Sequence, residues 1–132
     1  FPGRHGDFFV RTGIRPGLRY WVALNETGKV VGIVGLYNYE SDLADTAWLG
    51  WYLVSPRARK QGIGTSLLLF AIEEAKRQGK SSLKLYSTTD PEELDAHQLF
   101  KKHGFRLISE EPWEPDSELT KLIFELDLRA QT

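Results

Sequence analysis

The 132-residue sequence contains no cysteine. A disulfide framework, a thiol nucleophile and a cysteine-based metal site are therefore excluded. No apolar run approaches the about 18 residues of a membrane span, and no secretory signal opens the chain. Lys and Arg number 17 against 18 Asp and Glu, so the basic excess typical of nucleic-acid and membrane-surface binders is missing. We therefore expect a cytoplasmic globular protein with no nucleic-acid and no membrane partner.

Methionine is also absent, so Phe1 is not a natural start. We expect the chain to be truncated at its N-terminus or preceded by another segment. Its length fits one domain with one core, and we assign residues 1–132 to that domain. The sequence leaves open whether the domain acts as a monomer or forms a homodimer.

Gly and Pro residues separate segments of alternating or helical periodicity. Strands are predicted at residues 20–24, 30–39, 46–54, 83–87, 105–109 and 119–128. Helices are predicted at 62–78 and at 91–103, the second with Asp90 as N-cap and Pro91 in its first position. Residues 7–10 are interpreted as a short helix, and 110–118 as a loop.

This order, β-β-β-α-β-α-β-β, predicts an α/β (α+β) fold with a mixed central sheet flanked by helices. The central βαβ unit requires parallel strands joined by a right-handed crossover, and the flanking hairpins are antiparallel. Strand 30–39 is apolar on both alternations and is expected inside the sheet. Strand 119–128 alternates, which indicates one buried face.

The most informative stretch joins a strand end at Val54 to a helix that starts at Gly62 and Gly64. The first turn of a helix carries free N–H groups and a partial positive charge. Glycines remove the Cβ atoms that would keep an anion away. Cations and hydroxyl donors flank these glycines: Arg57, Arg59, Lys60, Thr65 and Ser66. The pattern favours a cradle for a diphosphate, the alternative being a solvated basic loop.

Two common nucleotide motifs do not fit this stretch. A P-loop needs a Lys after Gly64, and a dinucleotide fingerprint needs a third Gly at position 67. The spacing Arg59-x-x-Gly62-x-Gly64 after a Val-x-Pro strand end instead resembles the acetyl-CoA signature of the GCN5-related N-acetyltransferase (GNAT) superfamily. A second likeness is Ala96-x-x-Leu99-Phe100-x-x-x-Gly104-Phe105. The resemblance covers about residues 20–128.

The resemblance implies an acetyltransferase that uses acetyl-CoA as co-substrate, needs no metal, and acts on a small-molecule amine or a protein amine in a ternary complex. Loop amides would hold the pyrophosphate, and the backbone at the strand end would hold the pantetheine arm. The cofactor-binding residues carried over are Leu53, Val54, Ser55, Arg59, Lys60, Gln61, Gly62, Ile63, Gly64, Thr65, Ser66 and Phe100.

The chain departs from the family at the positions that often carry proton-transfer groups. Phe100 stands where a Tyr general acid is common, and Trp48 and Gly50 stand where a base is common. The remaining titratable candidates are His97 and the loop acids Glu40, Asp42 and Asp45. The alternative is that His97 is a solvated surface residue and that the acids solvate a turn, so the catalytic residues stay open. Glu93 replaces an Asn at the start of the second helix.

Aromatic residues cluster on two adjacent predicted strands: Tyr37, Tyr39, Trp48, Trp51 and Tyr52. They form either an acceptor pocket or part of the core, and only half of them can line one pocket because strand residues alternate faces. Trp113 belongs to an acceptor lid or to an ordinary loop. The missing proton-transfer groups also leave a second hypothesis, a non-catalytic acetyl-CoA or acyl-CoA-binding regulatory domain.

Overall fold

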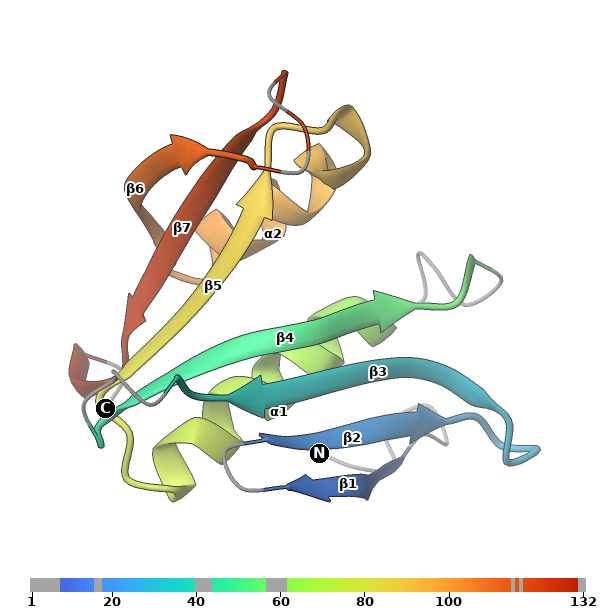
Figure 1. Cartoon of the computed structure of the whole chain (residues 1–132). Coiled ribbons are helices and arrows are strands. Elements are labelled where there is room, and N and C mark those ends of the chain that lie inside the picture. Colours follow the sequence, from blue (N-terminus) through green and yellow to red (C-terminus); the bar gives the residue numbers. More distant parts are fainter. Residues whose placement is uncertain are drawn as a thin grey trace.

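The computed structural model describes residues 8–15, 18–39, 44–56, 62–114, 116 and 118–130. Within these ranges one mixed sheet of seven strands has the spatial order β1-β2-β3-β4-β5-β7-β6 (Figure 1). The strands are β1 (Phe8–Arg15), β2 (Leu18–Leu24), β3 (Val30–Tyr37), β4 (Thr46–Val54), β5 (Ser82–Thr88), β6 (Arg106–Pro112) and β7 (Thr120–Asp127). The helices are α1 (Ile63–Arg77) and α2 (Leu94–Lys102), with 3₁₀ turns η3 (Pro91–Glu93) and η4 (Leu128–Ala130).

Both α1 and α2 lie on the same face of the sheet. Helix α1 covers β3 and β4, and α2 covers β5 and β7 (Figure 1). The core fills the space between this face and the helices, and its fully buried side chains come from both halves: Val34, Leu67, Leu68, Leu83, Phe124 and Leu126. Each such side chain contributes about 1.5–3 kcal/mol relative to an exposed one. We call the other side of the sheet, which no described helix covers, the open face.

Helix α1 forms because its apolar residues recur at helical spacing. One stripe is buried: Leu67, Leu68, Ala71, Ile72 and Ala75. The chain leaves the helix at Gly79, whose φ of 81° is the left-handed conformation typical of this position. At 15 residues α1 is the longest helix of the described part, and no helix there has the length and apolarity needed to cross a membrane.

The predicted fold is confirmed in its main features. Strands β4 and β5 are parallel across α1, and every other neighbouring pair is antiparallel. Strand β3 lies inside the sheet, and β7 buries one alternation, Leu122, Phe124 and Leu126. The predicted helix at 91–103 is split, because Asp90 caps the short 3₁₀ turn η3 before α2 begins.

Two local predictions are wrong. Residues 8–10 belong to strand β1, not to a helix, and pair with β2, for example Phe9 opposite Ala23. Strand β6 continues to Pro112, through residues predicted as loop, because Glu110 and Glu111 pair with β7. In both places a neighbouring strand supplies backbone partners, and this pairing outweighs the weak local preference of a short segment.

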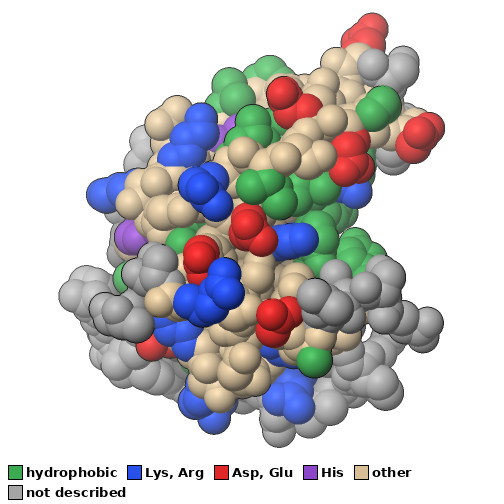
Figure 2. Space-filling model, turned by 90° about the vertical axis from the view of Figure 1, so that its left-hand side faces the viewer, with side chains coloured by type: hydrophobic (Ala, Val, Ile, Leu, Met, Phe, Trp, Pro, Cys, Tyr) green, Lys and Arg blue, Asp and Glu red, His purple; other side chains and the backbone are tan. Residues whose placement is uncertain are grey.

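Strand β6 forms one edge of the sheet, and the side chains of Leu107 and Ile108 are exposed there. Figure 2 shows this side of the molecule, with hydrophobic side chains gathered in its upper half. Lower down, basic and acidic side chains alternate instead of forming one basic surface.

Candidate functional site

Strands β4 and β5 lie side by side only at their beginnings. They pair from Thr46 opposite Ser82 to Trp48 opposite Lys84, and then separate (Figure 1). Residues 49–54 of β4 therefore have no β5 partner, while the rest of β5 pairs with β7. The result is a wedge-shaped opening in the middle of the sheet, with backbone groups of β4 along one edge.

Strand β4 carries a bulge beside this opening. Between the pairs Ile33–Leu53 and Gly35–Gly50 the chain advances two residues on β3 but three on β4. Such an extra residue is common next to active sites because it redirects the strand.

After the bulge, the strand's alternation decides which backbone groups reach the opening. The Ser55 N–H donates to Val31 O (2.8 Å), so the backbone of Ser55 points toward β3. Leu53 O lies 3.2 Å from where a Cβ on Gly32 would be, so Leu53 also faces β3. The backbone of Tyr52 and Val54 therefore faces the opening. Sequence reasoning selected Leu53 together with Val54 and missed Tyr52, because a bulge leaves no mark in the residue pattern.

Helix α1 begins at the mouth of this opening. Its N-cap, Gly62, has φ 82°, and no described side chain caps the helix. A Cβ on Gly62 would meet no atom within 4 Å, so the space above it is open. The first turn contains no acidic residue, and Thr65 and Ser66 are half-buried within it. These features fit a bound phosphate group better than a covered helix end.

Tyr52 joins β4 to the start of α1. Its hydroxyl donates to the Gly64 carbonyl at 2.6 Å, and burial raises the pKa of the hydroxyl above its ordinary value. A Cβ on Gly64 would lie 3.1 Å from that hydroxyl oxygen, so the absence of a side chain allows the approach. The Tyr52 ring also contacts Phe100 of α2, with ring centroids 5.8 Å apart. Tyr52 thus lies between the two helices on the covered face.

The predicted cofactor-binding residues fall into three groups. Residues 53–55 and 62–66 come together at the mouth of the opening, on β4 and α1. Phe100 is 4% exposed and packs with the rings of Phe105 and Phe124. Arg59, Lys60 and Gln61 lie outside the described residues, as does Glu40. The assignment of all twelve to cofactor binding stays a prediction.

His97 is buried, not solvated as one sequence interpretation held. It is 6% exposed, and its ring lies 5.5 Å from that of Phe124. The Ser87 hydroxyl donates to Glu93 (3.1 Å) and also forms a hydrogen bond with His97 Nε2 (2.7 Å). Glu93 also accepts from Thr88. Burial lowers the pKa of His97, the Glu93 carboxylate raises it, and the Lys101 ammonium lowers it.

Asp45 has a structural role at the start of β4. Its carboxylate accepts from the Ser81 hydroxyl (2.8 Å), which lowers its pKa, and its carbonyl accepts from the N–H groups of Ser81 and Ser82. Asp45 therefore connects the start of β4 to the start of β5 through hydrogen bonds. Asp42 lies outside the described residues.

The aromatic residues divide between the two faces as expected. Tyr37, Tyr39 and Trp48 lie on the open face, where Tyr37 stacks on Trp48 (6.3 Å, 22°) and Tyr39 meets it edge-on (5.4 Å, 79°). Tyr52 lies on the covered face, and the side chain of Trp51 is not among those described. A Cβ on Gly50 would lie 2.7 Å from the Tyr37 ring, so this glycine makes room for the stack.

Two lysines extend the aromatic surface across β5 and β7. The Nζ of Lys84 lies 5.8 Å from the centroid of the Trp48 ring, and the Nζ of Lys121 lies 4.9 Å from that of Tyr86. The Trp113 ring is 5.8 Å from Tyr86, so the segment after β6 folds against the open face. Sequence reasoning missed Lys84, whose place beside Trp48 depends on the register between β4 and β5.

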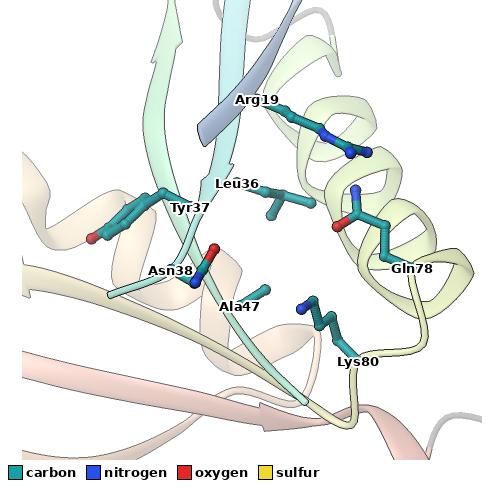
Figure 3. Close-up of a pocket in the computed structure, with 7 residues that line it drawn as sticks. All are labelled: Arg19, Leu36, Tyr37, Asn38, Ala47, Gln78 and Lys80. Atoms are coloured by element: carbon teal, nitrogen blue, oxygen red, sulfur yellow. The ribbon is translucent and has the colours of Figure 1, made fainter. Parts of the chain in front are cut away.

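A separate pocket of about 180 Å³ lies near the C-terminal end of α1, away from Gly62. Figure 3 shows Arg19, Gln78 and Lys80 around it, with Leu36 directed toward α1 and Tyr37 directed away on the opposite side of β3. The pocket does not coincide with the opening between β4 and β5.

Comparisons with known proteins agree with this geometry. The model of the acetyltransferase (GNAT) family matches residues 2–105. Aminoalkylphosphonate N-acetyltransferase of Salmonella typhimurium is 32% identical over 103 residues, which cover 76% of this chain and 64% of that relative. The chain thus matches less than two thirds of the relative's length.

Solved structures share the fold at low identity. The IAA acetyltransferase of Bacillus cereus has a TM-score of 0.72 at 22% identity, covering 83% of this chain and 77% of that one. A GNAT family acetyltransferase of Elizabethkingia anophelis, solved with acetyl-CoA bound, has a TM-score of 0.73 at 18% identity, covering 84% and 76%. The family model spans well over half of the sequence, and the chain belongs to the acetyltransferase (GNAT) family.

Proposed function

We propose that this chain transfers an acetyl group from acetyl-CoA to an amine by direct attack in a ternary complex. The observation that carries the proposal is the opening after the Trp48–Lys84 pair, with the uncapped start of α1 at its mouth. An extended thioester arm fits along the edge of β4 that faces the opening, and an anionic group fits at the start of the helix.

The diphosphate rests on the N–H groups of the first turn of α1, which begins at Ile63. Gly62 leaves the approach open, and the hydroxyls of Thr65 and Ser66 add donors nearby. Residues 59–61 complete the cradle in this proposal. The pantetheine arm lies along the end of β4, where the backbone of Tyr52 and Val54 faces the opening, and Phe100 forms part of the wall between β4 and α2.

The chemistry needs little more than positioning. The neutral amine attacks the thioester carbonyl, a C–N bond forms, the C–S bond breaks, and the amine proton leaves with the thiolate or to solvent. Holding the reactants at attack distance is the main contribution of the protein. A backbone N–H on the edge of β4, from Tyr52 or Val54, polarises the carbonyl oxygen. A thiolate whose conjugate acid has a pKa of about 8.5 leaves without a strong acid, which suits a site with Phe100 in place of a hydroxyl donor.

The acceptor approaches from the open face, where the aromatic surface of Tyr37, Tyr39 and Trp48 borders the opening. The related protein from Salmonella is named for aminoalkylphosphonates, and another protein of this fold is a spermidine N-acetyltransferase. These names share a primary amine and differ in the charge of the remainder. A primary amine is therefore the acceptor class that we propose.

The test is the release of free CoA from acetyl-CoA with a panel of primary amines, together with calorimetric titration of acetyl-CoA. We expect acetyl-CoA to bind and CoA release to depend on the amine. Binding without release for any amine would favour the second hypothesis, a regulatory domain that senses acyl-CoA. The absence of binding at millimolar acetyl-CoA would contradict both.

A further inference from the structure

A buried hydrogen-bond donor without a partner lies on the open face beside the opening. The side chain of Trp48 is 8% exposed, and its indole Nε1–H meets no acceptor among the described residues. A buried donor left unsatisfied is costly, and in native proteins it usually has a reason such as a ligand. Trp48 belongs to the last residue pair before β4 and β5 separate.

The other member of that pair is a cation. Lys84 is half-buried, its Nζ lies over the Trp48 ring, and it forms no ion pair with any described residue. Its cross-strand neighbour on β7 is Glu125, whose carboxylate accepts from the Ser82 hydroxyl at 2.8 Å. An ammonium and an indole N–H therefore stand together, and no described acceptor satisfies either.

The positive charge of Lys84 decides whether a cationic or an anionic ligand suits this surface. Three aromatic rings alone would suit a cationic group. Lys84 already places its ammonium over Trp48, and a second cation about 4 Å away would be repelled by about 4 kcal/mol at an effective dielectric constant of 20. An anion would instead be attracted to Lys84, against some repulsion from the Glu125 carboxylate on β7, and would supply the acceptor that the Trp48 N–H does not find among the described residues.

We propose that Lys84 and Trp48 bind the anionic group of an amine acceptor, so that the substrate class is short amines carrying a phosphonate or carboxylate. This inference rests on the proposed acetyl transfer at the same opening. With its anion at the Trp48–Lys84 pair, a short acceptor directs its amine toward residues 49–52, where the edge of β4 that faces the opening begins. Because the Trp48 Nε1 is buried, the proposal requires a neighbouring side chain to move when the anion binds, and Tyr39, 46% exposed and edge-on to Trp48 at 5.4 Å, is the side chain that we propose.

The first test measures binding without turnover. Methylphosphonate contains the anion but no amine, and tetramethylammonium is a cation of similar size. In calorimetric titrations of the CoA-saturated protein we expect millimolar binding of methylphosphonate and none of tetramethylammonium. Binding of tetramethylammonium alone, or of neither ion, would overturn the assignment whatever the protein does with acetyl-CoA.

The variants separate this site from general charge. Lys84→Met keeps the aliphatic stem, and Trp48→Phe keeps a ring without the N–H. We expect Kd for methylphosphonate to rise about tenfold or more in Lys84→Met and about fivefold in Trp48→Phe. Lys121→Met is the matched control, because it also removes a lysine from over an aromatic ring on the open face. Lys121 pairs with Thr88, four residues along β5 from Lys84 or about 13 Å, so we expect a change of less than twofold.

The second test compares two acceptors that differ only in the anion, aminomethylphosphonate and methylamine. We expect kcat/KM to favour the phosphonate by about tenfold or more in the wild type and by less than about threefold in Lys84→Met. Lys84→Arg, which restores the charge, should recover most of the preference. Equal preference in wild type and Lys84→Met would overturn the inference while leaving acetyl transfer intact. Methylphosphonate binding without any CoA release would instead support the anion site and contradict the proposed transfer.

Discussion

At the opening, the two faces of the sheet differ in whether their buried polar groups have hydrogen-bond partners. On the covered face, the Tyr52 hydroxyl, the His97 ring and the Ser87 hydroxyl are all buried or half-buried and hydrogen-bonded. On the open face, Trp48 and Lys84 present donors for which no described residue supplies an acceptor. Packing against a helix requires satisfied groups, whereas a face that receives a substrate keeps donors available.

Leaving the buried Trp48 N–H without an acceptor lowers the stability of the protein only moderately. An unsatisfied buried donor destabilises a protein by about 1–3 kcal/mol, which a domain of 5–15 kcal/mol total stability tolerates at one place. A ligand that supplies an acceptor for the Trp48 N–H removes that cost, and the free energy recovered in this way strengthens binding of the ligand. The comparison thus predicts that changes on the covered face alter cofactor binding and stability, and that changes on the open face alter acceptor preference.

The largest expected effect comes from Gly62→Asp at the start of α1. A carboxylate and a Cβ would occupy the open space above the helix, where we propose that the diphosphate binds. We expect the Kd for acetyl-CoA, measured by calorimetry, to rise at least about 100-fold. The control is Gly28→Asp, because Gly28 has nearly the same φ (83°) and equally open surroundings in the turn before β3. Equal loss of affinity in both variants would trace the effect to backbone strain.

Gly50→Ala tests whether a change on the open face affects the acceptor and not the cofactor. Its Cβ would lie 2.7 Å from the Tyr37 ring, so the ring must shift and disturb its stack on Trp48. We expect the acceptor KM to rise about tenfold, with the Kd for acetyl-CoA within twofold of wild type. The free energy of unfolding should fall by about 1–3 kcal/mol, as in other overpacked sites.

Gly64→Ala is the counterpart on the covered face and should give the reverse result. Its Cβ would lie 3.1 Å from the Tyr52 hydroxyl, so the Kd for acetyl-CoA should rise while the acceptor KM stays unchanged. Parallel changes of both constants in both glycine variants would show that the two faces are not separable.

Tyr52→Phe removes the hydroxyl that holds β4 to the start of α1. We expect the free energy of unfolding, measured by urea denaturation, to fall by about 1 kcal/mol. The variant loses the 2.6 Å hydrogen bond to the Gly64 carbonyl but keeps the aromatic ring. A gain in stability would indicate that this bond contributes less than the burial of the hydroxyl costs.

The smallest effect that we expect is on the pH dependence of stability in His97→Gln, which also lowers the stability at every pH because it replaces a buried ring that packs on Phe124. Burial holds the pKa of His97 below the ordinary value of about 6.5, so the unfolded chain takes up a proton first as the pH falls. The stability due to the neutral ring is therefore complete above pH 6.5 and declines below it, until the folded form is also protonated. The melting temperature, measured between pH 7.5 and pH 5, should fall more steeply with decreasing pH in the wild type than in the variant. Identical pH profiles would contradict the buried neutral state.

Much of the fold follows from local pattern. The stripe from Leu67 to Ala75 and the two-sided apolar run of β3 identify a packed helix and an interior strand, because each must bury its own apolar surface. The pattern failed at residues 8–10 and at Glu110 and Glu111, where pairing with a distant strand decides the conformation. Short segments carry little preference of their own, so their neighbours in space determine them.

The candidate site divides in the same way. Gly62 and Gly64 after a strand end were recognisable, because a phosphate cradle is built from consecutive residues. The Trp48–Lys84 pair, the approach of Tyr52 to Gly64 and the Ser87–His97 bond join residues that are 10 to 36 positions apart. No spacing rule applies to such pairs.

The sequence by itself determined that a helix with a bare, glycine-bearing start follows a buried strand, because those properties depend on residues adjacent in the chain. Only the tertiary structure decided that β4 and β5 separate after one short paired segment and that a bulge turns the backbone of Tyr52 toward the opening. It also decided that a lysine with no ion-pair partner among the described residues lies over a buried indole. These features depend on the register between strands, which is set by the packing of the whole sheet against α1 and α2.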